Sequence, residues 1–150
     1  MQNRLKINPP GYLLICLVLM FALRVWLPLC AFIEPPQAYA GLVAVLFGIL
    51  VSATSSGLFK KAGTGVEPFS EASVLVTSGL YLFSRNPMYV GMFIMLLGFA
   101  FMMGRLGALL PLPFFVMIIR KRFVMPEESF LEAAFGQPYL DYKSRVRRWI

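Results

Sequence analysis

Apolar residues dominate four stretches of this chain, and short polar segments separate them. The stretches cover residues 11–33, 38–59, 87–103 and 106–124. A helix needs about 20 apolar residues to cross the hydrocarbon core of a bilayer, so the first two stretches are long enough. Only Gly104 and Arg105 separate the last two, which predicts a short helical hairpin. The pattern therefore predicts an all-α integral membrane protein with about four transmembrane helices.

The remaining segments complete a single membrane domain that covers residues 1–150. A polar loop at 60–86 joins the second and third stretches, and a helical tail covers 125–150. Pro111 and Pro113 lie near the start of the fourth stretch. Because proline removes a backbone donor and clashes with the preceding turn, we expect these two residues to kink that helix.

Composition supports a lipid environment. The chain is 59% hydrophobic and 14% charged, and its mean hydropathy is +0.73. An ordinary soluble domain is about 45–50% apolar and about 25% charged. A bilayer is therefore the favoured solvent, and the alternative for the shorter stretches is a buried hairpin in the core of a soluble protein.

Basic residues predict the orientation in the membrane. Twelve of the fourteen lie in the N-terminal segment, in the loop at 60–86 or after residue 119, and only Arg24 and Arg105 lie elsewhere. The positive-inside rule then places both termini in the cytoplasm of a multi-pass protein, in the cell inner membrane. The net charge of +7 suits anionic lipid headgroups. Because the basic residues flank the spans, we do not expect nucleic acid as a partner.

The residue types that are absent restrict the chemistry. The chain has no histidine, which excludes a Ser-His-Asp triad and a His-Glu-x-x-His zinc helix. Cys16 and Cys30 form no Cys-x-x-Cys pair, so we expect packing roles for both and no metal site. Any chemistry must use carboxylates, tyrosines, arginines, backbone groups or a cofactor.

The stretch SRNPMYVG, residues 84–91, begins the third helix. Asn86 is a suitable N-cap and Pro87 suits the first helical position. The free N–H groups of a helix start attract anions, and Arg85 adds a positive charge beside them. Gly91 and Gly98 share one helical face, which allows close packing by a neighbour. The alternative is a capped helix end that binds no ligand.

The tail contains a second proline-marked helix start. Pro126 suits the first helical position, and Glu127 and Glu128 follow in the first turn, where the helix dipole favours acids. We expect this helix to end at Gly136. An amphipathic helix that suits the headgroup layer then begins at Pro138. Simple dipole matching is the alternative to a ligand-binding role for the acidic pair.

Two blocks together carry a resemblance to a known family. LVTSGLYLFSRNPMYVG, then a hairpin, then EESFLEAAFGQPYLDYKSRVRRW resembles the isoprenylcysteine carboxyl methyltransferases and their small bacterial relatives, with phospholipid N-methyltransferases as more distant kin. The similarity covers the chain from about Phe59 to the C-terminus. It implies methyl transfer from S-adenosylmethionine to a lipid-like or membrane-embedded carboxylate or amine, at the cytoplasmic face.

The resemblance also implies a cofactor pocket formed by the loop and the tail. Its cofactor-binding residues would be Ser73, Val74, Leu75, Val76, Tyr81, Arg85, Asn86, Pro87, Met88, Tyr89 and Glu127. In this assignment Arg85 and the helix start hold the cofactor's carboxylate, and Glu127 holds its amino group or another donor. An amine acceptor would need a base, for which Glu128 and Tyr89 are the candidate catalytic residues.

Three positions depart from the prenylcysteine enzymes. Ser73 and Asn86 stand where those enzymes have histidines, and Asn86 cannot titrate. Phe123 stands where they have an arginine for the substrate carboxylate, and the adjacent Arg122 is the candidate substrate-binding residue. The cofactor site is therefore better supported than a prenylcysteine substrate.

Two other functions stay open at this point. Membrane sterol reductases share a related C-terminal architecture and would bind NADPH in a similar pocket, although they usually have more spans. A non-enzymatic membrane adaptor would use its polar clusters only to anchor helix ends. The ligand that binds would distinguish the three functions.

Overall fold

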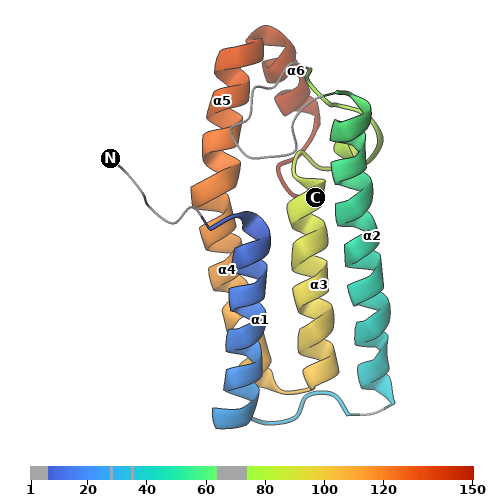
Figure 1. The fold of residues 1–150 in the computed structure, drawn as a ribbon, viewed down its shortest axis with the longest axis vertical. Helices are drawn as coiled ribbons and strands as arrows, with labels where there is room; N and C mark the ends of the chain where they lie inside the picture. The colour runs from blue at the N-terminus through green and yellow to red at the C-terminus, as the bar shows by residue number, and fades with distance from the viewer. Residues whose placement is uncertain (1–6, 28, 35, 64–73) are drawn as a thin grey trace.

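The computed structural model describes residues 7–27, 29–34, 36–63 and 74–150. The helices of the bundle run side by side, and the last two helices of the chain lie at one end of it (Figure 1). The elements are α1 (Pro9–Trp26), η1 (Gln37–Tyr39), α2 (Ala40–Lys61), η2 (Gly79–Leu82), α3 (Pro87–Met103), η3 (Leu106–Leu109), α4 (Pro111–Ile119), η4 (Arg120–Val124), α5 (Met125–Phe135) and α6 (Gln137–Arg145). The predicted all-α class is confirmed for the described residues.

Among the residues that the structure describes, two helical segments are long and apolar enough to cross a bilayer. They cover Pro9–Trp26 and Gln37–Lys61, with mean hydropathies of 1.7 and 2.1. Their outward faces expose large apolar side chains, including Val18, Phe21 and Val43. Soluble monomers rarely expose contiguous apolar patches of more than a few hundred Å². Lipid contact explains this surface, while the count of four spans and the orientation stay predictions.

The first helix is shorter than predicted. It ends at Trp26 instead of reaching residue 33, because Leu27 leaves the helical region with φ −127° and ψ 70°. Leu27 precedes Pro28, and a residue before proline is disfavoured in the helical region. Cys30 therefore lies outside the helix and is exposed, contrary to its predicted packing role, whereas Cys16 is buried as expected.

Glycines set the distance between α2 and α3. Gly48 faces Gly91, and Gly41 faces Gly98, so that the two antiparallel helices meet backbone to backbone. A Cβ on Gly48 would lie 2.6 Å from the carbonyl oxygen of Gly91, and a Cβ on Gly98 would lie 2.6 Å from that of Gly41. The predicted close packing at Gly91 and Gly98 is confirmed, and the neighbour is α2.

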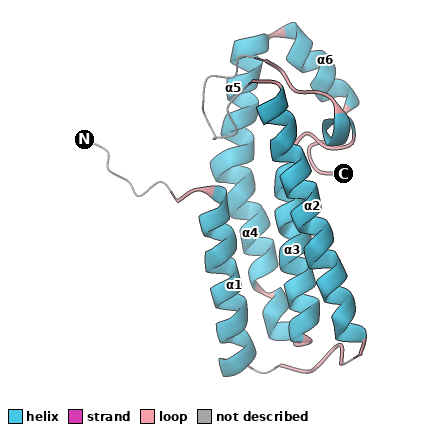
Figure 2. Cartoon of the chain, turned by 45° about the vertical axis from the view of Figure 1, so that its right-hand side comes forward, coloured by secondary structure: helices cyan, strands magenta, loops and turns pink. Residues whose placement is uncertain are grey.

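A nearly continuous helical column runs from α4 through η4 into α5, as Figure 2 shows. Pro111 and Pro113 lie in the first turn of α4, where the N–H groups lack intrahelical partners in any case. They therefore do not interrupt the helix, contrary to the predicted kink. The π-helical turn η4 precedes Pro126, and such a turn accommodates a residue that cannot donate to the turn before it.

The predicted end of α5 at Gly136 is confirmed, but its predicted start at Pro126 is not. Pro126 and the two glutamates lie in its first turn, and Gly136 ends it with φ 58°. Val124 and the rest of η4 are themselves helical. The acidic pair therefore projects from the side of a continuing helix, not from a free helix start.

We expect Gly48→Ala to lower the melting temperature in detergent, because the new methyl group overlaps the α3 backbone. Such overpacking costs about 1–3 kcal/mol. Gly57→Ala is the matched control in the same helix, since a Cβ there meets nothing within 4 Å. The control should leave stability unchanged or raise it by about 0.5–1 kcal/mol. Equal effects of both variants would contradict the glycine contact.

Candidate functional site

Polar side chains from three distant parts of the chain meet at one end of the bundle. We call Arg85, Tyr89, Glu127, Glu128 and Arg148 the polar cluster. Arg85 precedes α3, Tyr89 lies in the first turn of α3, the glutamates lie in α5, and Arg148 follows α6. The predicted meeting of the loop and the tail is therefore confirmed for the described residues.

Tyr89 and Glu127 form the first contact of the polar cluster. Tyr89 is 2% exposed, and its hydroxyl donates to Oε1 of Glu127 at 3.0 Å. Burial raises the pKa of Glu127 to about 7, and the hydrogen bond from Tyr89 acts in the opposite direction. Glu127 can therefore exist in either protonation state near neutral pH.

Glu128 forms the second contact, with two arginines. Nη2 of Arg85 lies 3.1 Å from its Oε1, and the side chains of both residues are only 9% exposed. Arg148 binds the same carboxylate through both oxygens, with Nε donating to Oε1 at 2.9 Å and Nη2 to Oε2 at 2.7 Å. Both oxygens of Glu128 are thus engaged, which leaves its predicted role as a base without support from the geometry.

Arg85 has two nitrogens without a hydrogen-bond partner in the part of the chain that the structure describes. Its Nε and Nη1 are buried and donate to no group among the residues that the structure describes. A buried donor without a partner costs about 1–3 kcal/mol, and more when it is charged. The side chain therefore presents two donors that suit an anionic ligand group.

The start of α3 is as predicted, but its cap is different. Pro87 occupies the first turn and Asn86 the N-cap position, yet the Asn86 side chain makes no capping hydrogen bond. Its Nδ2 donates instead to the carbonyl of Arg148 at 3.0 Å. The hydroxyl of Ser84 accepts from the Asn86 N–H at 3.1 Å. Asn86 therefore ties the tail to the helix and does not cap it.

The other predicted cofactor residues that the structure describes have different surroundings. Ser73 lies outside the described residues, and Val74 is exposed. Leu75 and Val76 are partly buried against three buried tyrosines: Tyr81, Tyr139 and Tyr142. Tyr142 donates to the carbonyl of Tyr81 at 2.7 Å, which holds α6 against η2. The carbonyl of Met88 accepts from Ser52 of α2 at 3.0 Å, so it faces the helix packing.

Arg122 lies apart from the polar cluster. It is exposed, donates to the hydroxyl of Tyr12 at 2.7 Å and lies over the Tyr12 ring at 5.8 Å. Phe123 is buried and packs between Tyr12 and Tyr89, with ring centroids 5.8 and 6.4 Å away. An aromatic wall therefore separates Arg122 from the Tyr89–Glu127 pair.

Sequence reasoning missed Arg148 and Tyr12. Arg148 is one of several basic residues near the C-terminus, and the positive-inside rule explained all of them at once. Tyr12 lies at the start of the first apolar stretch, where an aromatic residue at the membrane interface is ordinary. Neither position carries a local pattern that marks it as part of a site.

We expect Glu127→Gln to reduce the dependence of stability on pH. The native carboxyl keeps its proton up to about pH 7, whereas the unfolded chain releases it near 4.5. The native state therefore binds more protons in this range, and its stability falls as the pH rises through it. The effect on stability is measured as the melting temperature of the unliganded protein at pH 5 and at pH 7.5. These two pH values span most of the interval between the unfolded and the native pKa of Glu127.

Glu132→Gln is the control for this measurement. It removes a carboxyl group from the same helix, but from a more exposed ion pair with Lys143. Between pH 5 and pH 7.5 the melting temperature should fall less in Glu127→Gln than in the wild type. In Glu132→Gln it should fall as much as in the wild type. A fall of the same size in the wild type and in Glu127→Gln would show that this carboxyl does not hold its proton in the native state.

Comparison with known proteins agrees with the predicted resemblance. Residues 36–138 match the family described as phospholipid methyltransferase. An uncharacterized protein of Haemophilus influenzae is 35% identical over 63 residues, which is 42% of this chain and 100% of that protein. A protein-S-isoprenylcysteine O-methyltransferase of Schizosaccharomyces pombe is 36% identical over 76 residues, which is 49% of this chain but only 31% of that enzyme. Since the family match covers well over half of its length, this chain belongs to the phospholipid methyltransferase family.

Proposed function

We propose that this protein transfers a methyl group from S-adenosylmethionine to a lipid-like acceptor at the cytoplasmic face of the membrane. The observation that carries the proposal is the polar cluster, which places a carboxylate and guanidinium donors that lack partners among the described residues together at the end of an apolar bundle. The family and the yeast relative support the methyl transfer itself. The donor, the acceptor and the membrane face belong to the proposal.

The chemistry of the polar cluster fits a zwitterionic cofactor. S-adenosylmethionine carries a carboxylate and an ammonium on the same carbon. Arg85 offers its buried Nε and Nη1 to an anion, and Glu127 offers a carboxylate to a cation. Charge-assisted hydrogen bonds of this kind are about twice as strong as neutral ones. Arg85 and Glu127 are therefore the residues that would hold the two charged groups.

The protein's part in the reaction is mainly positioning. The cofactor supplies an activated methyl group on its sulfonium, so an acceptor needs to be held in line with it. A carboxylate acceptor needs no base. For an amine acceptor, Tyr89 and Glu127 provide the hydrogen-bonded pair through which a proton can leave. Two arginines bind the carboxylate of Glu128. In this proposal Glu128 therefore orients these arginines and is not the base.

An apolar groove offers a place for the acceptor's hydrocarbon chain. A cavity of about 240 Å³ lies between α1 and α4, and its lining is Tyr12, Ile15, Cys16, Leu19, Leu23, Leu110, Pro111, Phe114, Phe115 and Ile118. From Tyr12 to Leu23 the helix rises roughly 16 Å. One leaflet of the ~30 Å hydrocarbon core has a similar thickness. The groove therefore suits a single lipid chain of one leaflet.

The end of the groove at Tyr12 lies nearest the polar cluster. Arg122 binds Tyr12 there and supplies a positive charge for an anionic headgroup. Phe123 contacts both Tyr12 and Tyr89, so the groove and the Tyr89–Glu127 pair share one aromatic wall. In this arrangement Arg122 contacts the lipid acceptor and not the cofactor.

We expect the purified protein to bind S-adenosylmethionine, but not NADPH, in calorimetry in detergent. Glu127→Gln should weaken this binding by roughly tenfold to a hundredfold, because it removes a charge-assisted hydrogen bond of about 1.5–3 kcal/mol. The assay is completed by transfer of a labelled methyl group into a phospholipid extract and into a prenylcysteine analogue.

Glu132→Gln is again the control, because Glu128→Gln would break two buried ion pairs. Binding of NADPH alone would favour a reductase, and binding of neither ligand would favour an adaptor. Equal losses of affinity in Glu127→Gln and Glu132→Gln would remove Glu127 from the site.

We expect Leu19→Trp to raise the KM for the lipid acceptor several-fold without changing the affinity for S-adenosylmethionine. The larger ring fills the groove between α1 and α4, which the cofactor does not enter. Val18→Trp is the matched control, since Val18 is 61% exposed and does not line the groove. Steady-state kinetics with a fixed cofactor concentration measure the difference, and equal KM values for the two variants would contradict the assignment.

A further inference from the structure

The last five residues form a strap across the start of α3. After α6 ends at Arg145, Val146 is extended, with φ −115° and ψ 131°. The carbonyl of Arg147 accepts from the N–H of Arg85 at 2.9 Å. The carbonyl of Arg148 accepts from Nδ2 of Asn86 at 3.0 Å and from the Ser84 hydroxyl at 3.4 Å. Backbone contacts therefore fix this strap against the helix start.

The strap delivers one side chain into the polar cluster. Arg148 binds both oxygens of Glu128, at 2.9 and 2.7 Å. Arg85 reaches the same carboxylate through a single nitrogen, Nη2, at 3.1 Å from Oε1. One carboxylate thus pairs with two guanidinium groups. Arg148 contacts both of its oxygens, whereas Arg85 contacts only Oε1.

This division determines what Arg85 can do. Guanidinium and carboxylate groups favour a two-point pairing when both oxygens are accessible. Because Arg148 occupies Oε2 and shares Oε1, Arg85 is restricted to one point of contact. Its Nε and Nη1 then stay without partners among the described residues, although they are buried.

We propose that Arg148 is a positioning residue that keeps Arg85 available for the anionic group of a ligand. Without Arg148, Glu128 would offer both oxygens to Arg85, and the resulting pair would be neutral and closed to other anions. The proposal rests on the proposed function in one respect, since the anionic group is taken to be the carboxylate of S-adenosylmethionine. Arg148 itself does not touch the cofactor in this arrangement.

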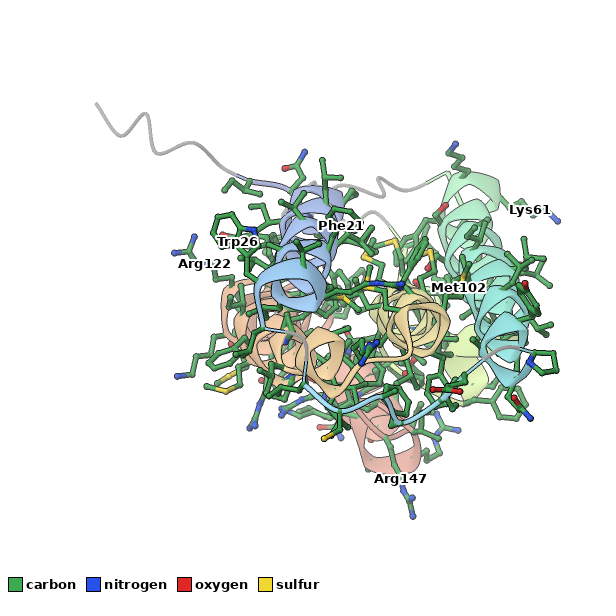
Figure 3. All side chains as sticks on the ribbon, turned by 90° about the horizontal axis from the view of Figure 1, so that it is seen from below. Phe21, Trp26, Lys61, Met102, Arg122 and Arg147 are labelled. Atoms are coloured by element: carbon green, nitrogen blue, oxygen red, sulfur yellow. The ribbon has the colours of Figure 1, made fainter. Side chains whose placement is uncertain are left out.

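Arg148→Ala and Arg147→Ala provide a matched test in the full-length protein. Both variants remove one positive charge from the strap and keep its backbone carbonyls. The side chain of Arg147 is exposed and points away from the bundle (Figure 3). We expect Arg148→Ala to weaken S-adenosylmethionine binding by about tenfold or more, the scale of one lost charge-assisted contact. Arg147→Ala should stay within about twofold of the wild type.

A second ligand separates positioning from a general structural role. Methylthioadenosine keeps the nucleoside and the methyl-bearing sulfur, as a neutral thioether, but lacks the cofactor's amino-acid portion with its carboxylate. Arg148→Ala should leave its affinity unchanged if the variant acts only through Arg85. Equal losses for both ligands, or equal effects of Arg148→Ala and Arg147→Ala, would overturn the proposal.

Rescue tests the mechanism more directly. If Glu128 captures Arg85 once Arg148 is gone, then Glu128→Gln in the Arg148→Ala background should recover part of the lost affinity, because a neutral amide cannot form the ion pair. A further loss in the double variant would overturn the proposal.

A cofactor-free measurement distinguishes failure of this inference from failure of the proposed function. The Nε–H resonance of Arg85, assigned through Arg85→Lys, should shift in unliganded Arg148→Ala and stay in place in Arg147→Ala. If the wild type binds neither ligand, the proposed function fails. The resonance then decides the positioning role alone, and an unshifted signal in Arg148→Ala overturns it.

Discussion

The buried carboxylate of Glu128 needs positively charged partners. This requirement joins the segments that form the polar end of the bundle. The side chain of Glu128 is 9% exposed and meets Arg85 and Arg148. An isolated buried charge costs several kcal/mol, whereas a carboxylate with good hydrogen-bond partners on both oxygens is tolerated. Since these partners come from the start of α3 and from the end of the chain, the carboxylate of α5 can be buried only when all three segments have come together.

The position of α3 links this polar end to the apolar bundle. Gly91 packs against Gly48 of α2 one turn after the first residues of α3, and Ser52 binds the carbonyl of Met88 at 3.0 Å. These contacts fix the helix in the region from which Tyr89 reaches Glu127. Backbone contact through glycine leaves little freedom for sliding or rotation, so the apolar packing determines where a polar side chain is presented.

Phe123 is the residue at which the apolar and polar parts meet. It is buried between Tyr12, at one end of the α1–α4 groove, and Tyr89, in the polar cluster. In the proposed function, this wall keeps the hydrocarbon chain of the acceptor on one side and the charged cofactor groups on the other. The reacting atoms would then meet at the border, where water is largely excluded and positioning is most effective.

Local patterns in the sequence determined the helical class, the start at Pro87 and the end at Gly136, because proline and glycine act within one turn. The resemblance of two sequence blocks to a known family, and no local pattern, placed Tyr89 and Glu127 in one candidate site. Only the tertiary structure decided that Glu128 is shared by Arg85 and Arg148, that Asn86 binds the tail and that Arg122 turns to Tyr12. Such contacts join residues 62 to 110 positions apart or compete for one carboxylate. No local pattern encodes which of several arginines reaches a given partner, since that depends on how the whole chain packs.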